Sequence, residues 1–334
     1  MFIGASAAKP AEGRQFRLYR GSLMRVFPPV VIGVLAALAS ALIGAGWQIA
    51  TRWGATTSLH PLDLALMRYV APGLILLPIL FRHGLAPRGV SAPTMIVMIA
   101  SGGLPFGLLA MMGAQFAPVA HMAALLPGSM PLFVALLAWI AFKEKLTTLR
   151  AVGLCVVIAG IALIAAPAFS ASHSGQWLGD LLFLLASLFW AFFTIAFRKS
   201  GLGAWHGAAI VSFWSALAVA PLWWFAGANR LGAAPAYDIA LQFMMQGVVA
   251  GVLGLATFTI AVKFLGAQRA ALSGALVQIF SVVGGALLLR EQPTVLTMIG
   301  VALTTAGVAI ASQSGALKAT LLRSHPTPSP SQRA

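Results

Sequence analysis

The chain is dominated by ten apolar runs, each long enough to cross a lipid bilayer as a helix. A helix needs about 20 apolar residues to cross the ~30 Å hydrocarbon layer. Hydrophobic residues make up 60% of the 334 residues and charged residues only 8%, against roughly 25% charged residues in an average soluble domain. This composition excludes a soluble fold. The runs lie at 29–51, 61–81, 93–114, 118–142, 148–166, 177–198, 204–226, 239–263, 267–289 and 294–312.

The Lys and Arg residues indicate how the chain crosses the membrane. They lie in links and tails rather than along one face, so the net charge of +15 does not predict a nucleic-acid partner. If the N-terminus is inside, the outer links hold only Arg52, Arg230 and Arg290. Because cytoplasmic links are enriched in Lys and Arg, we predict a multi-pass protein of the bacterial inner membrane with both termini in the cytoplasm.

The ends of the chain are expected to lie outside the bilayer. Basic residues before the first run resemble a signal peptide, but that run is longer than the roughly 7–15 residues of a signal sequence. Residues 1–28 are therefore predicted to be a cytoplasmic segment, and residues 313–334, which contain PTPSPSQ, a disordered cytoplasmic tail. Cys155 lies in an apolar run with no second cysteine, so we expect it to pack in the core.

The two halves of the chain repeat each other. Residues 120–162 align without gaps to residues 267–309 at a shift of 147, and the first run aligns to the sixth at a shift of 146. Matched positions include Glu144 with Glu291, Gly153 with Gly300, Gly160 with Gly307 and Arg52 with Arg198. Five spans are an odd number, so the second half enters the membrane from the opposite side. We predict an all-α integral membrane protein of ten transmembrane helices, built as two inverted five-helix repeats at 29–166 and 177–312, an architecture typical of transporters.

Several short motifs recur in both halves or open particular spans. They are Pro131-Leu132-Phe133, Lys143-Glu144-Lys145-Leu146, Gly153 and Gly160, their echo Arg290-Glu291, Gly300 and Gly307, then Met67-Arg68-Tyr69 and Gly179-Asp180. With these motifs the chain resembles the drug/metabolite transporter superfamily and, within it, the ten-helix EamA-type proteins, which include exporters of amino acids and other metabolites. The chain departs from the family pattern where the family places its central cavity, at Ile43-Gly44 in the first span and at Gln278, which replaces a proline.

Polar and aromatic residues within the spans are the candidates for substrate contact, because polar groups in a bilayer must face protein or water. Arg68 could attract a carboxylate, snorkel to the surface or pair with Asp63. Gln278 could line a cavity or bond a neighbouring helix. The tryptophans suit apolar, aromatic or cationic groups, or simply pack. The full candidate set is Trp47, Gln48, Arg68, Gln115, His121, Trp190, Trp214 and Gln278.

Prolines and small residues mark where helices could bend or slide. Pro127 and Pro131 remove backbone donors inside the fourth span, so a kink is expected there. Gly103 with Gly107, and Gly247 with Gly251, form GxxxG patterns that permit close helix packing and are candidates for movement during gating.

The absent motifs narrow the function. The sequence has no HExxH or GxSxG motif and no carboxylate at the centre of a span, so we expect neither an enzyme nor a metal or other cofactor. The expected partners are a small-molecule substrate and the bilayer, and the protein is expected to act as a monomer or weak homodimer. The leading function is export or facilitated exchange of small neutral or zwitterionic metabolites, with amino acids, aromatic ones included, as the leading class. The alternative is proton-coupled drug or metabolite efflux, for which His121 or Asp180 could carry the proton.

Overall fold

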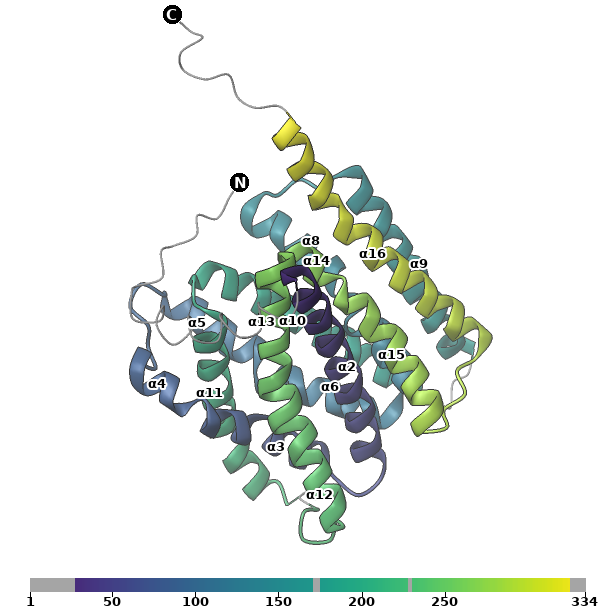
Figure 1. Ribbon diagram of the computed structural model, residues 1–334. Coiled ribbons are helices and arrows are strands. Elements are labelled where there is room, and N and C mark those ends of the chain that lie inside the picture. Colours follow the sequence, from purple (N-terminus) through teal and green to yellow (C-terminus); the bar gives the residue numbers. More distant parts are fainter. Residues whose placement is uncertain (1–27, 171–174, 228–229, 325–334) are drawn as a thin grey trace, which may run out of the picture.

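The computed structural model describes residues 28–170, 175–227 and 230–324, and every regular element within these ranges is a helix (Figure 1). Nine helical segments of this part of the chain are long and apolar enough to cross a membrane, and the bent pair α3 and α4 makes ten. The predicted all-α architecture of ten spans is therefore confirmed.

Each half supplies five spans, and several spans are made of two shorter helices. The first half consists of α2 (Pro29–Thr56), α3 (Pro61–Ile75) with α4 (Leu77–His83), α5 (Ala92–Gly102) with α6 (Leu104–Phe116), α7 (Val119–Leu125) with α8 (Met130–Phe142), and α9 (Thr148–Ser170). The second half consists of α10 (Gln176–Ser200), α11 (Ala204–Phe225), α12 (Ala236–Gln242) with the π-helix η1 (Phe243–Leu253) and α13 (Gly254–Leu265), α14 (Ala267–Ala271) with α15 (Ser273–Leu288), and α16 (Val295–Ser324).

Proline and glycine account for the breaks in the first half. The second span bends by 52° between α3 and α4, where Pro72 lies inside α3 and α4 has a proline in its first turn. Gly103 separates α5 from α6. The chain leaves the helix between Leu125 and Met130, at Pro127, before Pro131 opens α8. Since proline lacks a backbone donor, these positions end helical hydrogen bonding inside the bundle.

The helices pack according to the repeat. α2 of the first half packs against α13 and α15, and its counterpart α10 of the second half packs against α6 and α8. These are equivalent contacts, because α13 and α6 belong to the eighth and third spans and α15 and α8 to the ninth and fourth. The fifth and tenth spans, α9 and α16, lie side by side (Figure 1). The halves are thus related by a pseudo-two-fold axis, as expected for inverted repeats.

Glycines allow α9 and α16 to approach closely. A Cβ atom on Gly160 would lie 2.7 Å from the carbonyl oxygen of Gly300, and one on Gly153 would lie 2.8 Å from that of Gly307. The atoms in the way belong to the backbone, so a larger residue cannot be accommodated by turning a side chain. The glycine repeat seen in the sequence is therefore a packing device at this interface.

Replacing Gly160 with leucine should destabilise the protein by about 3 kcal/mol, the upper part of the usual range for overpacking. Thermal unfolding of the purified protein in detergent would measure the loss as a lower midpoint. Gly203→Ala is the matched control, because a Cβ atom there meets nothing within 4 Å. A midpoint for Gly160→Leu equal to that of the control would contradict this account of the interface.

The structure corrects two expectations. α16 continues to Ser324, so residues 313–324 of the predicted disordered tail are helical; they contain several good helix formers and no proline before Pro326. Residues 325–334, like the predicted N-terminal segment 1–27, lie outside the described residues. Cys155 is exposed on α9 rather than packed in the core, because the membrane-facing side of a helix is as apolar as its core side.

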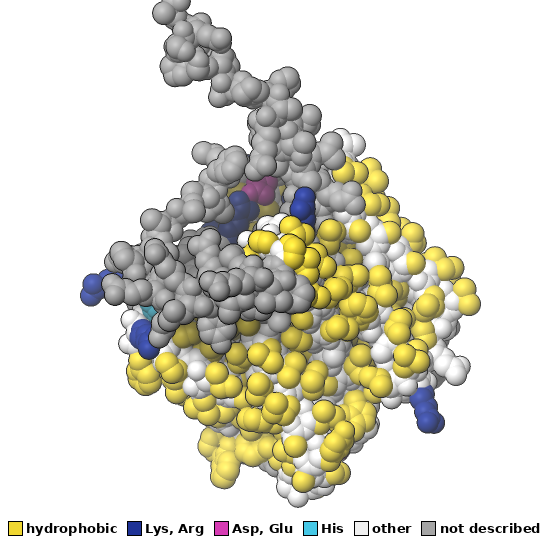
Figure 2. Space-filling view, viewed as in Figure 1, with side chains coloured by type: hydrophobic (Ala, Val, Ile, Leu, Met, Phe, Trp, Pro, Cys, Tyr) yellow, Lys and Arg dark blue, Asp and Glu magenta, His cyan; other side chains and the backbone are white. Residues whose placement is uncertain are grey.

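The surface agrees with a membrane environment. Figure 2 shows a broad face covered by hydrophobic side chains, with Lys and Arg at its margins. Leu287, Leu288 and Val295 are each more than 70% exposed. Such a surface would aggregate in water but suits contact with lipid.

His60 caps the N-terminus of α3. Its Nδ1 accepts from the backbone N–H of Leu62 at 3.2 Å, while the Asp63 carboxylate accepts from the backbone N–H of His60 at 2.8 Å. Burial, the largest cause, lowers the pKa of the His60 ring, and Arg230 lowers it further, against an opposing effect of Asp63. The neutral ring that the cap requires is thereby favoured.

Candidate functional site

A polar cluster joins the first, second and eighth spans. The indole nitrogen of Trp47 on α2 donates to Gln246 Oε1 at 2.7 Å, and Gln246 Nε2 donates to Thr51 Oγ1 at 2.9 Å. Gln242, one turn earlier in the same span, donates to the carbonyl oxygen of Ala50 at 2.6 Å. Both glutamines are completely buried. Sequence reasoning missed them, although two glutamines at i and i+4 in an apolar span are a visible signal of a shared helix face.

Arg68 of α3 extends into this cluster. Its Nη1 donates to the backbone carbonyl of Gln246 at 3.2 Å, and its guanidinium carbon lies 5.6 Å from the Trp47 ring centroid. Asp63, the partner considered from sequence, instead accepts from Trp223 Nε1 at 2.7 Å. Within the described residues no carboxylate forms an ion pair with Arg68. A cation placed in a membrane span without a counter-charge is costly, so the cluster favours an anionic group beside Arg68.

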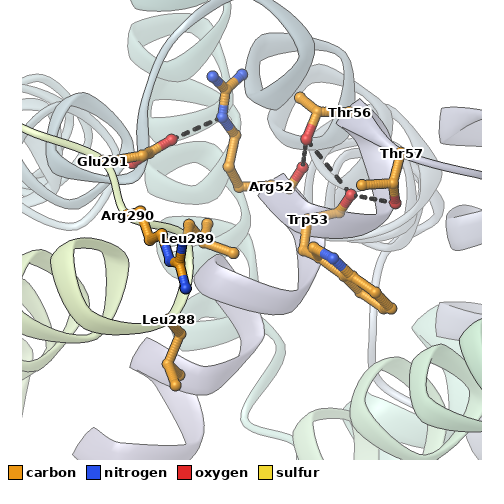
Figure 3. A pocket seen from close by; sticks show the side chains of 8 residues that line it. All are labelled: Arg52, Trp53, Thr56, Thr57, Leu288, Leu289, Arg290 and Glu291. Atoms are coloured by element: carbon orange, nitrogen blue, oxygen red, sulfur yellow. Dashed lines mark hydrogen bonds and ion pairs between the residues drawn. The ribbon is translucent and has the colours of Figure 1, made fainter.

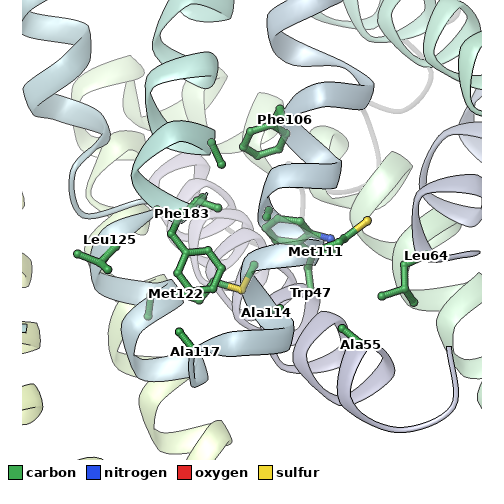
Figure 4. Packing of buried hydrophobic residues seen from close by; sticks show 14 of the residues in the cluster. Trp47, Ala55, Leu64, Phe106, Met111, Ala114, Ala117, Met122, Leu125 and Phe183 are labelled. Atoms are coloured by element: carbon green, nitrogen blue, oxygen red, sulfur yellow. The ribbon is translucent and has the colours of Figure 1, made fainter. Parts of the chain in front are cut away.

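An aromatic wall continues from Trp47 across the boundary between the halves. Phe106 of α6 stacks on Trp47 with ring centroids 6.3 Å apart and lies 4.8 Å from the Trp190 ring. Trp190 in turn lies 4.9 Å from Phe193 on the same helix, α10. Figure 4 shows Trp47 and Phe106 in the principal hydrophobic core. Phe106 therefore links Trp47 of the first half to Trp190 of the second half.

Gln278 and Gln48 are buried polar residues of the ninth and first spans. Gln278 Oε1 accepts from Thr304 Oγ1 at 2.8 Å and from Thr305 Oγ1 at 3.2 Å, which ties α15 to α16. Gln278 thus forms the interhelical hydrogen bond that the sequence offered as an alternative, through its side-chain oxygen. Its Nε2 and the Gln48 Oε1 have no hydrogen-bond partner among the described residues, so each retains capacity for a polar contact.

Two predicted residues lie away from this cluster. Gln115 is exposed on the surface of α6. Trp214 packs beside Phe213, with ring centroids 5.8 Å apart, in a separate hydrophobic cluster that contains Leu76 and Met98. Their helices turn both side chains away from the cluster, and a position in the sequence does not determine this direction.

The GxxxG glycines bring helices together around Arg68. A Cβ atom on Gly247 would lie 2.6 Å from Ala71 Cβ, and one on Gly251 would lie 2.7 Å from Pro72 Cγ. Gly107 faces the Tyr69 hydroxyl group, which donates to the carbonyl oxygen of Gly103 at 2.6 Å. The packing role of these glycines is present in the structure. Gly247 and Gly251 also belong to η1, and π-helical turns often mark functional sites.

Two ion pairs join the halves at opposite ends of the bundle. Arg52 Nε lies 2.9 Å from Glu291 Oε1, at what we name the Arg52 end, and Arg198 Nη2 lies 2.6 Å from Glu144 Oε1, at the Arg198 end. Each pair joins one half to the other. Because Arg52 aligns with Arg198 and Glu144 with Glu291 in the repeat, the two ion pairs are equivalent under the pseudo-two-fold axis.

The backbone beside both glutamates repeats as well. Lys143 and Arg290, which precede Glu144 and Glu291, both have φ of 55° in the left-handed region. A non-glycine residue rarely adopts this conformation, so its presence at both equivalent positions indicates that the same turn precedes both carboxylates. The repeat is therefore preserved in backbone conformation as well as in side-chain chemistry.

The two ion pairs differ in their surroundings. The side chains of Arg52 and Glu291 are 20% and 17% exposed, against 43% and 37% for Arg198 and Glu144. Glu291 Oε2 also accepts from the backbone N–H of Val119 at 2.8 Å, and Arg52 Nη1 donates to the Ala114 carbonyl at 2.6 Å. Figure 3 shows the Arg52–Glu291 pair at a cavity of about 380 Å³. The Arg52–Glu291 pair is thus the more buried of the two and has more hydrogen-bond partners.

His121 forms a third ionisable pair near the Arg52 end. Its Nδ1 lies 2.7 Å from Asp180 Oδ1 on α10, and its Nε2 lies 3.4 Å from Thr297 Oγ1 on α16. His121 and Asp180 are 6% and 5% exposed. The sequence singled out both residues but gave no sign that they touch, because 59 residues separate them.

The comparisons with known proteins agree with the architecture. The EamA-like transporter family matches residues 31–166 and again residues 177–313. A crystal structure of a protein shares the fold with a TM-score of 0.54 and 19% identity, covering 84% of this chain and 96% of that chain. No curated protein matches the chain.

Proposed function

Because the chain belongs to the EamA-like transporter family, we propose that it moves amino acids across the membrane by alternating access, as export or exchange. The observation that carries the mechanism is the duplicated ion pair. Arg52–Glu291 and Arg198–Glu144 each tie one half to the other, at opposite ends. A solute pathway between the halves opens at one end when that end's pair separates, while the other pair holds its end closed.

The repeat supports an exchange of roles between the two ends. Halves of similar sequence can adopt each other's slightly different shapes, which converts opening at one end into opening at the other. The lower exposure of Arg52 and Glu291 fits a state closed at that end. When the halves exchange shapes, Arg198 and Glu144 are expected to become the more buried ion pair.

The chemistry around Arg68 supports a zwitterionic substrate. A guanidinium without a carboxylate partner among the described residues can bind a substrate carboxylate through charge-assisted hydrogen bonds. The rings of Trp47, Phe106 and Trp190 offer a surface for an apolar or aromatic side chain, and ring faces also attract an ammonium group. An amino acid carries all three of these groups on a small frame.

Uptake of labelled amino acids into proteoliposomes tests the proposal. The panel contains phenylalanine, tryptophan, alanine and serine, and vesicles are preloaded with each unlabelled amino acid to detect exchange. We expect saturable uptake of at least one member that exceeds uptake into protein-free vesicles. No saturable uptake of any member, with or without preloading, would remove amino acids as the substrate class.

A further inference from the structure

We propose that His121 and Asp180 form a proton-binding site that couples solute movement to proton movement, a proposal that rests on the transport function above. The pair lies where α7 of the first half meets α10 and α16 of the second. Asp180 Oδ1 contacts the His121 ring at 2.7 Å, and Asp180 Oδ2 is buried with no hydrogen-bond partner among the described residues. The unpartnered oxygen is therefore available to accept a hydrogen bond or a proton.

In this proposal the pair exchanges one proton between two charge states. With one proton bound it is neutral overall, either as imidazolium and carboxylate or as neutral imidazole and carboxylic acid. Without that proton it carries one negative charge in a buried site, which is costly unless water reaches it. Opening of the bundle beside the pair would admit water and release the proton, while closing would favour its retention. Proton binding is thereby linked to the same movement that exposes the solute pathway.

A chain of hydroxyl groups connects the pair to the surface. His121 Nε2 lies 3.4 Å from Thr297 Oγ1, which lies 3.0 Å from the hydroxyl of Thr294. Thr297 is buried and Thr294 is exposed. A threonine hydroxyl both donates and accepts, so Thr297 can donate to a neutral His121 ring or accept from a protonated one. A cavity of about 200 Å³, lined in part by Ala120 and Gln176, reaches the neighbouring turns of α7 and α10 from the Arg52 end.

The repeat shows that the pair is not part of the duplicated framework. The alignment places Val34 opposite Asp180 and Gln268 opposite His121. The Arg–Glu pairs occur at both ends, whereas among the described residues the only His–Asp ion pair lies near the Arg52 end. A site that loads protons from one side needs no counterpart.

The charged groups around the pair are few. On the elements packed against α7 and α10, those near the Arg52 end are Arg52 and Glu291, which bind each other, with Arg290 beside them. α9 and α10 carry three more charged residues, Arg150, Arg198 and Lys199. These lie at the ends of the two helices that are remote from His121 and Asp180. The ionisable groups at this end, Arg52, Glu291, His121 and Asp180, therefore lie where a movement that separates the Arg52–Glu291 pair would change the surroundings of the His121–Asp180 pair.

A pH gradient across proteoliposomes tests the coupling. With the panel amino acid that gives the largest uptake, an imposed gradient should raise wild-type uptake at least five-fold. Asp180→Asn and His121→Asn should keep gradient-free exchange but lose the stimulation. The matched control is Asp238→Asn, which alters another buried acid, the partner of Ser58 at 2.5 Å, and should respond like the wild type. Stimulation that persists in Asp180→Asn, or is absent from the wild type, would overturn the proposal.

A second measurement does not depend on the substrate. Infrared difference spectra of the purified protein between acidic and neutral pH should contain a protonation signal that Asp180→Asn and His121→Asn both lose and Asp238→Asn retains. If this signal appears while no amino acid is transported, the proton site stands and the proposed substrate class fails. If amino acids are transported while the variants give wild-type spectra, the proton site fails and the transport function stands.

Discussion

Replacing Glu291 with arginine should lower the maximal transport rate at least ten-fold, and adding Arg52→Glu should restore most of it. The single change places two guanidinium groups together at a position where the native side chains are only 17–20% exposed. Like charges in such a setting cost on the order of 2 kcal/mol after allowance for partial solvent screening, and 1.4 kcal/mol corresponds to a factor of ten. Initial rates of amino-acid exchange in proteoliposomes measure the effect.

Restoration by the double variant should be incomplete, because Glu291 also accepts from the backbone N–H of Val119 at 2.8 Å. The matched control is the equivalent pair, Glu144→Arg alone and with Arg198→Glu. That pair is 37–43% exposed, so the single change should cost less, roughly two- to three-fold, as for an exposed ion pair. If the double variant at the Arg52 end transports no better than Glu291→Arg, the ion pair does not determine the transport rate.

Replacing Arg68 with glutamine should raise the KM for the transported amino acid about ten- to a hundred-fold. A hydrogen bond to a charged group contributes about 1.5–3 kcal/mol, and Arg68 has no carboxylate of the described chain to satisfy instead. The fold should tolerate the change, because removing an unpaired cation from a membrane span relieves a cost. Concentration dependence of initial uptake measures the KM.

The amide of the same amino acid separates a carboxylate contact from a general disturbance of the site. The amide lacks the negative charge, so wild-type protein should discriminate strongly against it as a competitor, and Arg68→Gln should discriminate little. Arg68→Lys is the conservative variant and should lie between them, since lysine keeps the charge but lacks the planar fork. Equal loss of affinity for the acid and its amide in Arg68→Gln would contradict the assignment of Arg68 to the carboxylate.

Much of the fold could be predicted because the membrane limits the possibilities. Each apolar run of about 20 residues had to become a spanning helix, and the repeat identified the equivalent spans. The interior breaks were less predictable. Pro127 and Pro131 marked one of them, but the π-helix η1 at Phe243–Leu253, two of whose glycines pack against α3, was not predicted. The sequence carried no signal for that geometry.

The site was predictable by residue type but not by partner. Arg52, Glu144, Arg198 and Glu291 all stood out in the repeat, yet their pairing across the halves follows from the packing of helices far apart in the chain. The sequence also did not show which way each side chain faces. Trp47 faces the interior while Gln115 faces outward, because an apolar span lacks the polar face that orients a helix in a soluble protein. Gln246, the residue that links Trp47 to Arg68, was missed although its spacing from Gln242 was a visible signal.

Distances between spin labels at the two ends test alternating access most directly. One labelled pair, Thr57→Cys with Gln292→Cys, reports on the Arg52 end, and another, Lys145→Cys with Lys199→Cys, reports on the Arg198 end. All four positions are exposed, and Cys155→Ala removes the native exposed thiol. On addition of the transported amino acid, pulsed electron paramagnetic resonance should show one distance lengthening while the other shortens. Distances that both stay fixed, or that lengthen together, would contradict a mechanism in which the two ends open in turn.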